Sequence, residues 1–212
     1  MSKPINPNTV LLELAAIFIT ADTALYVAYN SFMGGVMPIY AFALLSYTFI
    51  IAALVFIFDR ITSNKYSRDE RGLIDSLRMV DTALFTASVL AYSFVALMLE
   101  ERLFGSNYIV WVPTARADNA FMDLYYVLDS TAVPYLEFAL FVKRLPRLAG
   151  PLKACAFFAA IQALGALNVM VMLYQVAINA GYYALVFYLY RRINNVKALL
   201  APFVIYLLIK LV

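Results

Sequence analysis

Long apolar runs with few charges cover most of this 212-residue sequence, and they restrict the fold more than any other feature. The longest run, residues 149–190, contains a single charged residue, Lys153. Hydrophobic residues make up 65% of the chain and charged residues 14%, whereas soluble domains are about half apolar and a quarter charged. A core of ordinary size cannot bury so many apolar side chains. The composition therefore predicts an integral, multi-pass membrane protein with the lipid bilayer as its solvent.

Helices are the expected spanning elements, because backbone groups in lipid must be hydrogen-bonded internally and no pattern of short alternating strands competes. A span needs about 20 apolar residues. The apolar runs predict an all-α, polytopic transmembrane helix bundle of about seven helices, forming a single membrane-embedded domain over residues 1–212. The predicted spans are 9–30, 37–58, 76–98, 119–143, 149–165, 168–190 and 196–212.

The division of 149–190 into two helices depends on the distribution of positive charge. Lys and Arg concentrate in cytoplasmic loops. With seven spans, 13 of the 16 Lys and Arg residues lie on one side of the membrane. If 149–190 were one helix, the chain would have six spans and a weaker split of 11 to 5. The charge bias favours seven spans, with the N-terminus cytoplasmic and the C-terminus outside, and leaves six spans as the alternative.

The composition excludes several kinds of site. The chain has no histidine, which excludes His-ligated haem, zinc or copper and Ser-His-Asp catalysis. Its single cysteine, Cys155, excludes an internal disulfide and a thiolate cluster, and its apolar surroundings favour a small buried side chain. We expect no cofactor and no bound metal. The net charge of +3 requires no nucleic-acid partner.

Acidic residues inside the predicted spans are the first candidates for function, because each costs about 2.5–3.5 kcal/mol near the centre of a bilayer. The span 119–143 is the richest. Asp123 and Glu137 share one face, Asp129 lies on a second stripe, and no Lys or Arg occurs from residue 117 to 142. A helix that is polar over so wide an arc should lie centrally in the bundle. Its stripes are either a polar path with a proton or cation site, or buried hydrogen bonds that fix helix packing.

Two other predicted helices carry polar faces. In 9–30, Asp22 stacks with Tyr26 and has no basic residue within a turn, so it needs a distant partner, a bound cation or a proton. In 168–190, three amide side chains share one face and either line a polar cavity or join helix to helix. The candidate residues lining the transport path are Asp22, Tyr26, Asp123, Asp129, Glu137, Asn168, Gln175 and Asn179.

Transport of a small solute or an ion accounts for most of these residues, with a proton or small cation as the bound species. The alternative is a non-catalytic membrane subunit of a larger complex, in which the polar faces contact partner subunits or further copies of the chain. An enzyme has the least support, because no substrate motif accompanies the carboxylates. No catalytic residue is therefore predicted.

Overall fold

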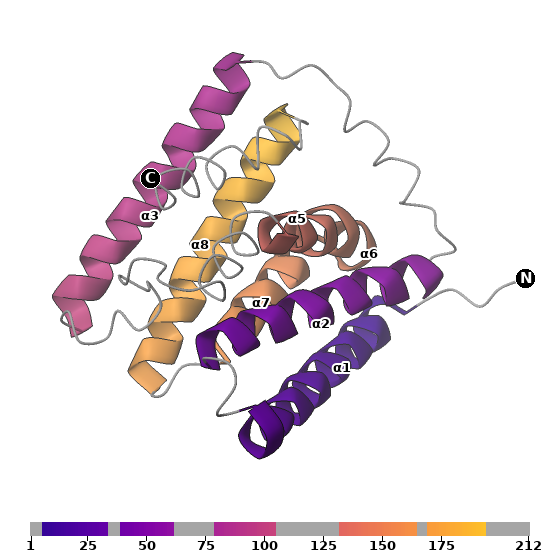
Figure 1. The fold of residues 1–212 in the computed structure, drawn as a ribbon. Helices are drawn as coiled ribbons and strands as arrows, with labels where there is room; N and C mark the ends of the chain where they lie inside the picture. Colours follow the sequence, from indigo (N-terminus) through magenta and orange to yellow (C-terminus); the bar gives the residue numbers. More distant parts are fainter. Residues whose placement is uncertain (1–5, 34–38, 62–78, 105–131, 165–168, 194–212) are drawn as a thin grey trace, which may run out of the picture. The chain divides into compact units, whose positions relative to one another are not determined.

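Helices make up every regular element in the part of the chain that the structure, a computed structural model, describes (Figure 1). The described residues are 6–33, 39–61, 79–104, 132–164 and 169–193. Over these ranges the predicted helical class is confirmed. The helices that are long and apolar enough to cross a membrane are Pro7–Ser31, Val80–Phe104 and Val169–Ile193. They support membrane insertion, while the predicted span 196–212 lies outside the described residues.

The chain divides into two compact units, each assembled from two separate stretches of sequence. Unit 1 comprises Met1–Arg71 and Ala120–Phe157, and unit 2 comprises Gly72–Asn119 and Phe158–Val212. Contacts between helices far apart in the sequence therefore hold each unit together.

The start of α1 (Pro7–Ala28) is determined locally. The Asn6 side chain accepts a hydrogen bond from the Asn8 N–H at 3.0 Å. Pro7 occupies the first turn of the helix, where backbone N–H groups make no intrahelical hydrogen bond, so the lack of an N–H on proline costs nothing there. The helix passes at its other end into a π-helical turn, η1 (Tyr29–Met33). The structure thus begins this helix close to the predicted start.

α1 packs antiparallel against α2 (Ile39–Ile61), as the element contacts and two pairs of rings show. The Phe18 ring lies edge-on to Tyr47 with the centroids 6.0 Å apart, and Tyr29 lies 5.0 Å from Phe42. Later residues of the first helix thus pair with earlier residues of the second. The buried apolar side chains of the two helices are Val10, Leu14, Phe18, Ile50, Ile51, Leu54 and Phe58.

The described part of the predicted fourth span is one helical segment that changes its winding twice. Its parts are α5 (Val133–Glu137), the π-helical stretch η5 (Phe138–Arg144) and α6 (Leu145–Ala149). The Leu145 N–H bonds to the carbonyl of Leu140, five residues back. Pro146 follows directly; it has no N–H and crowds the preceding turn. A proline at this position gives a physical reason for the wider turn before it.

This segment continues beyond the predicted helix end at residue 143 and stops at Gly150, where φ is +87°. Glycine adopts such a conformation readily because it has no Cβ. α5 and η5 pack on α2, and α6 contacts α1. Residues 138–145 are buried without interruption. Because a helix buried on all sides belongs in a core, the segment is a core element of unit 1.

Two helices occupy the long apolar stretch 149–190. The predicted division lies at residues 165–168, which are outside the described part. α7 (Pro151–Gln162) ends before these residues, and α8 (Val169–Ile193) begins after them. At 12 residues, α7 is about 18 Å long, shorter than the roughly 30 Å of a bilayer core.

Unit 2 is built on an antiparallel contact between α3 (Met79–Phe104) and α8, which lie side by side in Figure 1. Tyr92 of α3 donates a hydrogen bond to the Ile178 carbonyl at 2.6 Å. In return, Tyr174 of α8 donates one to the Ala96 carbonyl at 2.6 Å. Each helix thus supplies a hydroxyl to the backbone of the other, which links them at two points.

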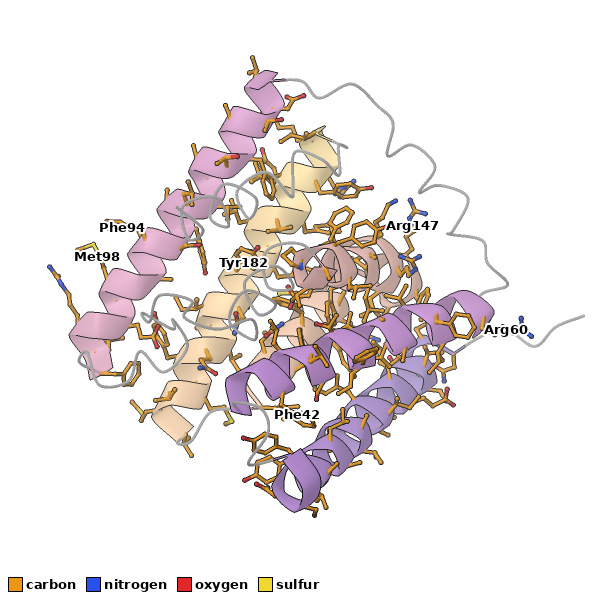
Figure 2. The ribbon with its side chains drawn as sticks, viewed as in Figure 1. Phe42, Arg60, Phe94, Met98, Arg147 and Tyr182 are labelled. Carbon is orange, nitrogen blue, oxygen red and sulfur yellow. The ribbon has the colours of Figure 1, made fainter. Side chains whose placement is uncertain are left out.

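Within unit 2, the described residues on the face of α3 turned away from α8 include exposed apolar side chains. Figure 2 shows Phe94 and Met98 on that side, and their side chains are 62% and 43% exposed. Exposed apolar side chains of this kind suit contact with lipid acyl chains. The α3 helix therefore has one face for its partner helix and another for the surrounding membrane.

Candidate functional site

A hydrogen bond between a tyrosine and a carboxylate joins two helices inside unit 1. The Tyr47 hydroxyl of α2 donates to Glu137 Oε1 of α5 at 2.7 Å. The two residues lie 90 positions apart in the sequence, so only the tertiary fold brings them together. A hydrogen bond to an ionised group is roughly twice as strong as a neutral one. The Tyr47–Glu137 pair is therefore the candidate site for a proton or small cation.

Apolar side chains of the described residues lie next to this pair. The Phe18 ring makes its edge-on contact with Tyr47, while Pro134 and Phe138, on either side of Glu137 in the helix, are buried. Polar interactions are stronger beside such side chains than in water. The protonation or cation occupancy of Glu137 should consequently affect the contact between α2 and α5.

Two basic side chains at the end of η5 are shielded from solvent. Arg144 is only 1% exposed, and its Nη1 donates a hydrogen bond to the Ala139 carbonyl at 2.8 Å. Lys143 is 9% exposed. The predicted span 119–143 ends at this point, whereas the structure continues the helix through Arg144. A buried guanidinium needs acceptors for its N–H groups, and the carbonyl five residues back is one of them.

Exposed basic residues gather at one end of unit 1. Lys153 Nζ, in the first turn of α7, donates a hydrogen bond to Asn8 Oδ1 at the start of α1, at 2.6 Å. α6 carries the exposed Arg147 and contacts α1. Because α2 is antiparallel to α1, its last turn, with the exposed Arg60, lies toward the same end (Figure 2). We name Arg60, Arg147 and Lys153 the basic end of unit 1.

The structure describes four of the eight predicted path side chains. Glu137 is half-buried in the pair described above. Tyr26 on α1 is 60% exposed. Gln175 and Asn179 are half-buried on α8, each one position after a residue that bonds to α3. The side chains outside the described residues are those of Asp22, Asp123, Asp129 and Asn168. A continuous path through all eight residues stays a prediction.

Sequence reasoning missed Tyr47 and the burial of Arg144. Tyr47 stands in the apolar run 37–58, and a phenol hydroxyl there is a natural donor to a carboxylate on another helix. Nothing local indicates which carboxylate it meets. Arg144 lies just after the predicted end of the span 119–143, and its burial depends on the continuation of the helix through η5 and α6.

The pair can hold a proton or engage a small cation, since a carboxylate and a phenol together accept and donate hydrogen bonds. Within the described ranges, no group of three or more His, Cys, Asp or Glu side chains could hold a metal ion. No known protein family, curated protein or solved structure matches this chain. Its function is therefore argued from the residues themselves.

Proposed function

We propose that this chain is a membrane transporter for an ion or a small solute, with intramembrane carboxylates as its proton- or cation-binding groups. The observation that carries the proposal is the Tyr47–Glu137 hydrogen bond between two helices of unit 1. An acidic residue in a spanning helix is costly, and such residues commonly mark ion pathways and proton relays. In this proposal Asp22, Asp123 and Asp129 supply the remaining carboxylates of the path.

Seven spans are part of the proposal. α3 and α8 are antiparallel, and two antiparallel spans must be separated by an even number of crossings. In this proposal the predicted spans 119–143 and 149–165 supply the two crossings, with α7 forming about 18 Å of the second. A single helix over 149–190 would run parallel to α3, so the observed direction of α8 supports seven spans rather than six. The N-terminus is then cytoplasmic and the C-terminus outside.

Ion flux into liposomes tests the proposal. The purified chain is reconstituted, and uptake of protons, reported by an internal pH dye, and of radioactive sodium is driven by a potassium diffusion potential. We expect flux above that of empty liposomes. Glu137→Gln should abolish it, because the amide cannot ionise, and Tyr47→Phe should reduce it.

Glu13→Gln is the matched control, since this carboxylate is exposed on α1 rather than bonded between helices. Flux through this variant should equal that of the unaltered chain. Properly folded protein that conducts neither ion, or flux that survives Glu137→Gln, would contradict ion transport through this site.

A non-catalytic subunit of a larger membrane complex is the second candidate. Gln175 and Asn179 favour it, because half-buried amides on an otherwise apolar helix gain hydrogen bonds from a partner helix, worth about 0.6 kcal/mol each in membranes. Purification in a mild detergent, followed by mass measurement, separates the two functions. A stoichiometric second protein would favour the subunit, and an active chain isolated alone would favour the transporter.

A further inference from the structure

The basic end of unit 1 has the features of a phosphate-binding surface. Arg147 and Lys153 are exposed, and the Lys153–Asn8 hydrogen bond ties the first turn of α7 to the start of α1. Asn8 is a neutral amide, and it takes up only one of the three N–H donors of the ammonium. Arg147 adds a guanidinium, whose planar N–H groups match phosphate oxygens.

The basic residues at this end differ in exposure from the two basic residues that precede them in the sequence. Lys143 and Arg144 are enclosed by the protein, whereas Arg60, Arg147 and Lys153 project where a ligand can reach them. The exposed carboxylate of Glu13 lies farther along α1, past the first turn. Among the described side chains, those around the start of α7 are therefore mainly positive, and the first-turn N–H groups of that helix add to its attraction for an anion.

We propose that this surface binds the phosphate headgroup of an anionic phospholipid, with Arg147 and Lys153 as the contacting residues and Arg60 as a supporting charge. A lipid is favoured over a free phosphate by position. The residues follow or precede apolar helices at one end of a membrane-embedded unit, where headgroups are concentrated. Anionic lipids in the cytoplasmic leaflet attract basic residues beside spanning helices.

Native mass spectrometry of the full chain in detergent, with added phosphatidylglycerol or phosphatidylcholine, tests this site. We expect preferential retention of phosphatidylglycerol. The double variant Arg147→Gln, Lys153→Gln should bind it about 30-fold more weakly, the effect expected from two charges near a membrane surface. The charge-preserving double variant Arg147→Lys, Lys153→Arg should retain most of the binding, which separates lost charge from lost folding.

Arg191→Gln with Arg192→Gln is the matched control. It removes two exposed arginines from the end of α8 in unit 2, which the sequence assigns to the same side of the membrane. Binding should be unchanged in this variant. Equal weakening in both double variants would mean unspecific attraction and overturn the proposal. So would inorganic phosphate that protects the protein against heat as strongly as the lipid does, since the ligand would then be the free anion.

Discussion

Gly181 shows how one missing methyl group sets the spacing of two helices. A Cβ built at this position of α8 would collide with the Tyr92 hydroxyl of α3 and lie 3.3 Å from the ring carbon that bears it. The same hydroxyl bonds to the Ile178 carbonyl. Small residues let membrane helices approach closely and form such contacts. The glycine therefore leaves room for the Tyr92 hydroxyl, which would have to shift if a Cβ were present.

We predict that Gly181→Ala destabilises the protein by about 1–3 kcal/mol, the usual cost of overpacking. In the Tyr92→Phe background the colliding hydroxyl is gone, so the same change should be nearly neutral. Thermal unfolding in detergent of the unaltered protein, the two single variants and the double variant measures this double-mutant cycle. Additive effects of the two substitutions would show that the hydroxyl and the glycine do not meet.

The sequence identified Glu137 as a functional candidate, because an acidic residue in an apolar helix stands out by its cost. It could not identify Tyr47 as the partner, since the two residues are 90 positions apart and the sequence alone does not show which hydroxyl of another helix meets the carboxylate. Chemical type is readable from one residue, whereas pairing depends on the relative rotation of two helices.

At the level of elements, α3 and α8 were predictable as helices but their contact was not. Their lengths of 26 and 25 residues follow from apolar runs of membrane-spanning length. Their direction and register depend on two tyrosine hydroxyls that reach backbone carbonyls, and amino-acid pattern does not encode that choice. The π-helical winding of η5 was missed for a related reason. Pro146 signals a distortion, but not whether the helix kinks, ends or widens.

Cross-linking tests the antiparallel arrangement of unit 2. In a Cys155→Ser background, Leu103→Cys with Leu173→Cys places two exposed thiols at the end where Phe104 and Tyr174 make a ring contact. A short bis-maleimide should join them. Leu103→Cys with Tyr188→Cys is the control, because about 22 Å of α8 separates residue 188 from residue 173. Cross-linking of the control pair alone would mean that the helices are parallel.

For the molecule as a whole, the distribution of positive charge and the geometry of each unit agree. Arg60, Arg147 and Lys153 occupy one end of unit 1, and the sequence had assigned all three to the cytoplasmic side. In unit 2, Arg191 and Arg192 end α8, while Arg102 lies in the last turn of the antiparallel α3 and so at the opposite end. The second pattern supports the seven spans proposed above, whereas the first occurs with six spans as well.

Labelling of the two chain ends tests the topology. Single cysteines at Ser2 and Lys210, in the Cys155→Ser background, are treated with a membrane-impermeant maleimide in intact cells. We expect labelling at residue 210 only, because an odd number of spans puts the ends on opposite sides. Permeabilised cells, in which both positions should react, provide the control. Labelling of both ends, or of neither, in intact cells would imply an even number of spans.

The Tyr47–Glu137 pair also has a consequence for how the chain is made. α1 and α2 leave the ribosome before residues 119–149, whose predicted span carries Asp123, Asp129 and Glu137. Each such charge disfavours insertion by about 2.5–3.5 kcal/mol at a helix centre, so this segment should enter the bilayer poorly by itself. The earlier hairpin, with Tyr47 in place, offers it a receiving surface. When residues 1–61 are deleted, residues 119–149 should therefore fail to insert into the membrane, as measured by glycosylation mapping. Undiminished insertion would show that the segment does not need the first two helices.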